Sequence, residues 1–161
     1  MKKKLIIAFI LILLVILQST ALDYLKIFNV KPDLVLAALI ILGLSLDLKW
    51  VMVFSYLAGF LKDMLGSLPF GLNTLAFPLL GFLVFKLSKK IAIETKYMKA
   101  ATVFMAVILE NLIAFVCFIF TGLDISLGIF SRFTIVSSIY TVLILILIFK
   151  IIRIPKIATH P

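Results

Sequence analysis

The chain has 161 residues, of which 65% are hydrophobic and 14% are charged. Soluble domains are about 45–50% apolar and about 25% charged, so this composition indicates an integral membrane protein with one domain. Its 16 Lys and Arg residues gather between apolar runs, a pattern that argues against a nucleic-acid-binding face. Cys117 and His160 are the only cysteine and histidine, which argues against an intrachain disulfide, a Cys- or His-based metal site and a Ser-His-Asp triad.

Six apolar runs follow one another, and they predict an all-α, polytopic membrane protein with about six transmembrane helices, or five as the fallback count. A helix needs about 20 apolar residues to cross a bilayer. The second and third runs are short, so they are half-spans or thin the bilayer locally. The first run has an alternative as a cleaved secretory signal, with small residues at Ser19 and Ala21. Within one domain, 1–161, the expected spans are 4–22, 33–46, 50–65, 72–87, 100–120 and 132–152.

The segments between the runs carry local signals for helix ends. Asp33 is expected in the first turn of the second helix, where the helix dipole favours a carboxylate. Residues 67–73 form a predicted turn, with Asn73 or Thr74 as the N-cap of the fourth helix. Residues 121–131 are predicted to be a loop.

Basic residues predict the orientation of the chain in the membrane. If the N-terminus is cytoplasmic, six spans return the C-terminus to the cytoplasm. Twelve basic residues then lie in inside segments and four in outside segments, which agrees with the positive-inside rule. The outside residues are Lys26, Lys31, Lys62 and Arg132; the inside ones are Lys2, Lys3, Lys4, Lys49, Lys86, Lys89, Lys90, Lys96, Lys99, Lys150, Arg153 and Lys156.

The stretch 58–74 places an ionisable pair and a Gly/Pro turn between two apolar runs. Gly59, Asp63 and Gly66 are four and three residues apart, so they are expected on one helical face where another helix approaches closely. We therefore expect a packing seam around a buried carboxylate. The alternative places both charges at the outer interface, with Lys62 reaching the headgroups.

Glu110 and Asn111 lie near the centre of the fifth span, and an intramembrane carboxylate is a candidate functional group. The pairing candidates for Glu110 are Lys62, Arg132 and Asn111. Helix packing or partner docking is one interpretation, and ion or substrate binding is the other. Motifs for catalysis or phosphate binding are absent, so neither an enzyme nor a cofactor is expected. The candidate helix-packing or partner-binding residues are Gly59, Asp63, Gly66, Pro69, Gly71, Asn73, Glu110 and Asn111.

Three stretches, 17–20, 28–34 and 59–73, resemble in order and spacing the bacterial rod shape-determining protein MreD family. The resemblance covers the chain to about Lys90 and continues only in hydropathy. It implies a non-catalytic scaffold of the cytoplasmic membrane in the cell-elongation machinery, which synthesises peptidoglycan. The implied partners are MreC, the actin-like MreB, the glycosyltransferase RodA and a penicillin-binding transpeptidase. Lys62 departs from the family pattern, in which an uncharged residue, often Gln, is expected.

The alternative resemblance is to the substrate-binding S component of energy-coupling factor vitamin transporters, which also has six spans and a similar architecture. In that case Asp63, Asn73 and Glu110 would line an outward-facing pocket for a vitamin-like molecule. Such a binder needs convergent polar groups in a concavity. The second half supplies few beyond Glu110, Asn111 and Arg132, which favours the scaffold.

Overall fold

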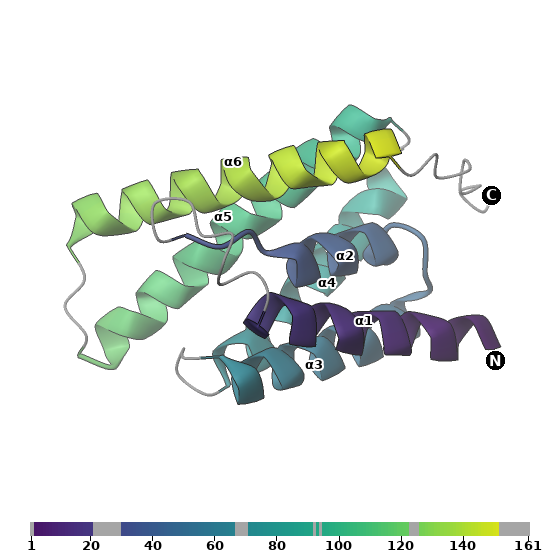
Figure 1. Cartoon of the computed structure of the whole chain (residues 1–161), viewed down its shortest axis with the longest axis horizontal. Coiled ribbons are helices and arrows are strands. Elements are labelled where there is room, and N and C mark those ends of the chain that lie inside the picture. Colours follow the sequence, from purple (N-terminus) through teal and green to yellow (C-terminus); the bar gives the residue numbers. More distant parts are fainter. Residues whose placement is uncertain are drawn as a thin grey trace.

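The computed structural model describes residues 2–20, 30–66, 71–91, 93, 95–122 and 126–151. These residues contain six helices and no strand, which confirms the all-helical prediction. The N-terminal end of α1 and the C-terminal end of α6 lie at the same end of the molecule. The hairpin of α5 and α6 projects at the opposite end (Figure 1). The helices are α1 (Lys2–Thr20), α2 (Leu34–Gly43), α3 (Leu48–Leu65), α4 (Leu72–Lys90), α5 (Lys96–Phe120) and α6 (Leu127–Ile151).

Three of the described helices are long and apolar enough to cross a membrane: α4, α5 and residues Leu127–Ile148 of α6. The apolar segments Lys4–Thr20 and Leu34–Gly43 are shorter. At about 1.5 Å per residue, α2 extends about 15 Å, which is half of a bilayer core of about 30 Å. The second run therefore forms a helix of half-span length, one of the two expected alternatives.

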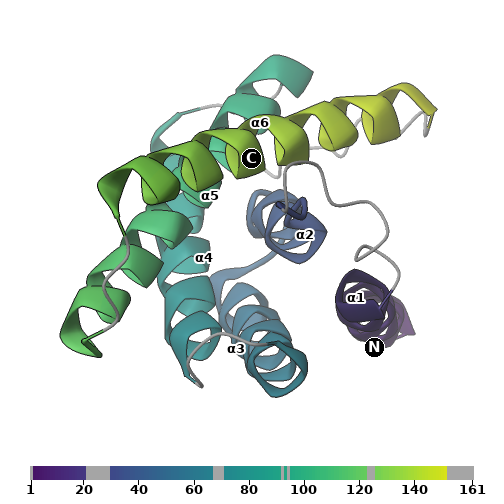
Figure 2. The same ribbon diagram turned by 60° about the vertical axis from the view of Figure 1, so that its left-hand side comes forward.

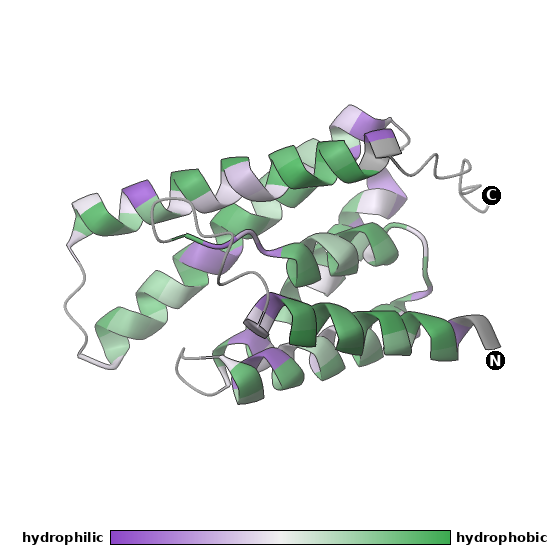
Figure 3. Cartoon of the chain, in the orientation of Figure 1, coloured by the Kyte–Doolittle hydropathy of each residue, from purple (hydrophilic) through white to green (hydrophobic). Residues whose placement is uncertain are grey.

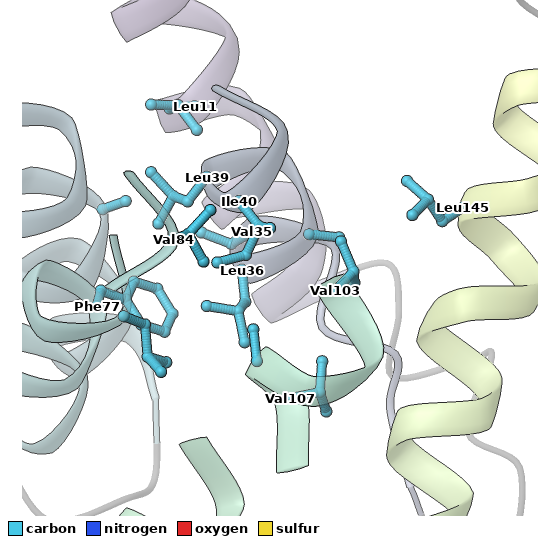
Figure 4. Close-up of a cluster of buried hydrophobic side chains, with 14 of the residues drawn as sticks. Leu11, Val35, Leu36, Leu39, Ile40, Phe77, Val84, Val103, Val107 and Leu145 are labelled. Atoms are coloured by element: carbon cyan, nitrogen blue, oxygen red, sulfur yellow. The ribbon is translucent and has the colours of Figure 1, made fainter. Parts of the chain in front are cut away.

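Helix α2 is the centre of the molecule, because it packs against all five other helices. Its sequence is apolar around its whole circumference, as expected for a helix that is covered on every side. Figure 2 shows α2 enclosed by α1, α3, α4, α5 and α6. Figure 4 shows its side chains between Phe77 of α4 and Val103 and Val107 of α5, all of them buried.

Helices α3 and α4 form the most extensive helix pair, and small residues allow their close approach. A Cβ atom on Gly59 would lie 2.4 Å from the backbone oxygen of Asn73. Ser55 lies about one turn before Gly59 on α3, and a Cβ atom on Gly81 of α4 would lie 2.7 Å from its hydroxyl oxygen. The backbones of α3 and α4 therefore lie close together along much of their length.

The starts of α5 and α6 depart furthest from the predicted spans. Helix α5 begins at Lys96, because the Thr95 side chain caps it by accepting a hydrogen bond from the amide of Met98. Helix α6 begins at Leu127, so the prediction of a loop is wrong for residues 127–131. The backbone oxygen of Ser126 accepts hydrogen bonds from the first turn of α6, and its hydroxyl accepts another, so a serine cap starts this helix early.

Candidate functional site

Hydrophilic residues interrupt the apolar helices at the C-terminal end of α3 and near the middle of α5 (Figure 3). At the first position, Asp63 is buried, with 5% of its surface exposed. Its two carboxylate oxygens accept five hydrogen bonds from the start of α4: the amides of Gly71, Asn73 and Thr74, the Asn73 side chain and the Thr74 hydroxyl, at 2.6–3.1 Å. A carboxylate of α3 therefore caps the positive end of α4.

The observed cap corrects the predicted one. The N-cap residue of α4 is Gly71, whose φ of +98° lies in the left-handed region that favours glycine. Asn73 and Thr74 lie inside the helix, and their amide groups donate to Asp63. The prediction that Asn73 or Thr74 forms the cap is wrong, because the preceding helix supplies the capping oxygens.

Lys62 points away from Asp63 and connects three helices. Its ammonium group forms an ion pair with Asp33, at the start of α2, and another with Glu110 of α5, at 2.8 Å. The ammonium also lies 4.7 Å from the centre of the Phe77 ring. Of the pairing candidates for Glu110, Lys62 is therefore the partner in the structure, whereas Arg132 is exposed. The alternative in which Lys62 reaches the headgroups is wrong.

The N-terminus of α2 completes this group of buried contacts. Asp33 caps α2 by accepting from the amide of Leu36, and its own amide donates to the hydroxyl of Thr141 in α6. From α1, Gln18 donates to the Asp33 carboxylate and accepts from the amide of Val35. We call Gln18, Asp33, Lys62, Glu110 and Thr141 the polar network. Charge-assisted hydrogen bonds of Gln18 and Lys62 to carboxylates join α1, α2, α3 and α5, and a neutral hydrogen bond to Thr141 adds α6.

The other predicted residues are placed as follows. Gly59 and Asp63 are both buried on the face of α3 that contacts α4. Gly66 follows the last residue of α3 in an extended conformation and is exposed, so the prediction of one helical face fails for Gly66. Asn111 is buried beside Glu110. Pro69 lies outside the described residues.

A cavity of about 740 Å³ adjoins the polar network. The buried polar residues on its lining are Asp33, Glu110, Asn111 and Ser137, and the half-buried Lys62 also lines it. Asp63 and Asn73, which a vitamin-binding protein would direct into such a pocket, do not line it. Among the described residues, no cluster of three or more His, Cys, Asp or Glu side chains is arranged to hold a metal ion.

This arrangement defines an all-helical protein of membrane-spanning composition, whose buried charges hold helix ends together. The family model of the rod shape-determining protein MreD matches residues 2–154, nearly the whole chain, and the chain belongs to this family. The match extends well beyond Lys90, where the resemblance by motif ends. No curated protein and no solved structure matches the chain.

Sequence reasoning did not select Gln18, Asp33, Thr74 or Thr141 as site residues. Gln18 and Asp33 each belong to a stretch that carries the family resemblance, and these stretches meet in the polar network. Their positions in these stretches could therefore have identified both as candidate site residues. Thr141 gave no signal, because its partner Asp33 lies 108 residues away and a threonine within an apolar helix is unremarkable.

Proposed function

We propose that this protein is a non-catalytic membrane scaffold of the bacterial rod-shape machinery, which directs peptidoglycan synthesis during cell elongation. Membership of the MreD family fits a role in that machinery. The proposed partners are MreC, MreB, RodA and a penicillin-binding transpeptidase, all implied by the family resemblance.

The observation that carries the proposal is that the polar side chains of the motif bond to other helices of the same chain. Asp63 accepts all five of its hydrogen bonds from the start of α4, and Lys62 pairs with two carboxylates of the same chain. A hydrolytic enzyme needs a nucleophile or base that faces a substrate. Asp63 and Lys62 instead fix the positions of α2, α4 and α5 relative to α3, which supports a protein that acts by presenting a defined surface to its partners.

We further propose that the protein crosses the cytoplasmic membrane several times with both termini in the cytoplasm. The described ends of α1 and α6 lie on the same side of the molecule (Figure 1). Lys86, Lys89 and Lys90 lie in the last turns of α4, and Lys96 and Lys99 in the first turn of α5. This grouping is the one that the positive-inside rule favours for a cytoplasmic connection.

The decisive experiment uses a rod-shaped bacterium that lacks its own family member and expresses this chain with an affinity tag. We expect rod shape to return, and MreC, RodA and the transpeptidase to co-purify in mild detergent at levels above those for an unrelated membrane protein. If rod shape returned while none of these proteins co-purified, the scaffold proposal would be wrong.

A matched pair of variants then connects the association to the structure. Asp63→Asn removes a buried cap, whereas Asp47→Asn changes an exposed carboxylate that makes no capping hydrogen bond at the other end of α3. We expect Asp63→Asn to reduce co-purification and to produce round cells, and Asp47→Asn to behave like the unchanged chain. Size-exclusion chromatography separates loss of association from loss of the folded protein.

The second candidate function is the vitamin-binding S component, and the cavity beside Glu110 and Asn111 is the observation in its favour. Against it, Asp63 of α3 and Asn73 of α4 bond each other across the helix pair and do not line the cavity. Calorimetric titration of the purified protein with vitamins distinguishes the two functions. Submicromolar binding together with normal cell shape for Asp63→Asn would favour the transporter component over the scaffold.

A further inference from the structure

Helix α4 has one covered face and one exposed face. Helices α2, α3 and α5 pack on the covered face, which includes Phe77, Leu80 and Val84. The side chains of the exposed face recur at intervals of three or four residues, a spacing that places them on one line along the helix. In chain order, these exposed side chains are Leu75, Leu79, Phe82, Lys86, Lys89 and Lys90. This face is therefore apolar along most of its length and basic at its C-terminal end.

Three lysines are crowded together at the end of this face. Lys86 lies three residues before Lys89 and four before Lys90, so the three side chains are neighbours on the helix surface and repel one another. All three are exposed, and among the described residues no carboxylate forms an ion pair with any of them. Instead, the Lys86 ammonium group lies 5.9 Å from the centre of the Phe82 ring. An anion bound between the lysines would relieve their repulsion.

The start of α5 adds positive charge close to these lysines. Lys96 and Lys99 lie in its first turn, which has no acidic residue, although the positive end of a helix dipole disfavours cations. A short connection separates this turn from the end of α4. Over residues 86–99 the sequence has five lysines and one acidic residue, Glu94. The lysines of this segment therefore outnumber its carboxylates, and its surface attracts anions.

The apolar part of the exposed face matches the depth of one leaflet of a bilayer. Helix α4 is long and apolar enough to cross a membrane. At about 1.5 Å per residue, Lys86 lies about 16 Å beyond Leu75 along the helix axis. One leaflet contributes about 15 Å, which is half of a hydrocarbon core of about 30 Å. A phospholipid whose acyl chain lies along Leu75, Leu79 and Phe82 therefore places its phosphate at the level of the lysines.

We propose that the exposed face of α4 binds an anionic phospholipid of the leaflet at its lysine end. The phosphate oxygens accept charge-assisted hydrogen bonds from Lys86 and Lys90, and an acyl chain covers the apolar side chains that precede them. An acidic peptide from the aqueous phase would use only the ammonium groups and leave Leu79 and Phe82 uncovered. A zwitterionic headgroup would bring its own cation among the three lysines. The face therefore selects a headgroup with a net negative charge.

Native mass spectrometry of the purified, delipidated protein tests the proposal with two lipids that share their acyl chains. We expect phosphatidylglycerol, which is anionic, to be retained at least fivefold better than phosphatidylethanolamine, which is zwitterionic. Excess glycerol 3-phosphate carries a phosphate without acyl chains, so it should leave the bound phosphatidylglycerol in place. Equal retention of the two lipids would overturn the proposal. Displacement by glycerol 3-phosphate would also overturn it, because the lysines would then bind a free phosphate and not a lipid.

A matched pair of double variants locates the binding on α4. Lys86→Gln with Lys90→Gln removes two charges from the exposed face and should lower the preference for phosphatidylglycerol at least threefold. Lys49→Gln with Lys150→Gln removes two charges from exposed lysines of α3 and α6 and should leave the preference unchanged. Equal loss in both double variants would assign the preference to overall charge and refute the site. The lipid preference of the unchanged chain decides independently of these variants, and independently of whether the chain binds MreC.

Discussion

Replacing Gly59 with alanine tests whether the close approach of α3 and α4 is required. The new Cβ atom would meet three backbone atoms: the oxygen of Asn73 at 2.4 Å, its carbonyl carbon at 2.7 Å and the Cα of Thr74 at 3.0 Å. Backbone atoms cannot rotate away, so the helices must separate. An ordinary contact of 3.4 Å to the Asn73 oxygen requires a displacement of about 1 Å.

This displacement also weakens the cap of α4. The hydrogen bond from the amide of Thr74 to Asp63 measures 2.8 Å, and an added 1 Å brings it to about 3.8 Å, beyond a hydrogen bond. Overpacking costs about 1–3 kcal/mol, and a hydrogen bond to a charged group contributes about 1.5–3 kcal/mol. Alanine returns about 1 kcal/mol in helix propensity. We therefore expect Gly59→Ala to lower the free energy of unfolding by about 2–4 kcal/mol.

Two other glycines supply matched controls for the same substitution. A Cβ atom on Gly43 would have its nearest neighbours at 3.7–3.9 Å, so Gly43→Ala should be neutral or stabilise by about 0.5–1 kcal/mol. Gly81→Ala should be intermediate, because the nearest atom is the hydroxyl of Ser55, which can rotate. Unfolding in mixed detergent micelles, followed by circular dichroism, measures all three. If Gly59→Ala were as stable as Gly43→Ala, the argument from close approach would be refuted.

Three further substitutions test the buried contacts by the same unfolding measurement. Asp63→Asn leaves donors of α4 unpaired at about 1–3 kcal/mol each, whereas Asp47→Asn should change stability little; equal effects would contradict the cap. Lys62→Gln leaves Glu110 unpaired and should lower the free energy of unfolding by about 3–5 kcal/mol. Adding Glu110→Gln should restore most of that free energy. If it did not, the pairing of Lys62 with Glu110 would be unimportant for stability. Gly71→Ala should cost about 1–2 kcal/mol through its φ of +98°, since its Cβ meets no neighbour within 4 Å; an unchanged stability would exclude strain.

Features that depend on local spacing were predictable from the sequence. A separation of four residues places Gly59 and Asp63 on one face of α3, and both are buried against α4. The prediction included Gly66 because periodicity alone does not show where a helix ends. Asp33 was expected at the start of a helix because a carboxylate is favoured there, and it caps α2.

Contacts between distant segments could not be derived in this way. Helix caps are normally sought within three residues of the first turn, but the carboxylate that caps α4 comes from α3, eight residues before Gly71. The pairing of Glu110 with Lys62 was one of several alternatives, because a sequence lists the charges within a membrane but not the rotation of each helix. Thr141 shows no periodic signal and contributes through its position in the fold.

Lys62 was the least explained residue of the sequence, and its position clarifies how the end of α3 is used. Because adjacent residues point about 100° apart on a helix, Asp63 reaches α4 while Lys62 reaches α2 and α5. The described residues of α3 make no close backbone contact with α5, so the long lysine side chain bridges that separation. An uncharged side chain at this position would leave Glu110 without its cation. Lys62 and Glu110 therefore act as one unit, in which each side chain requires the other.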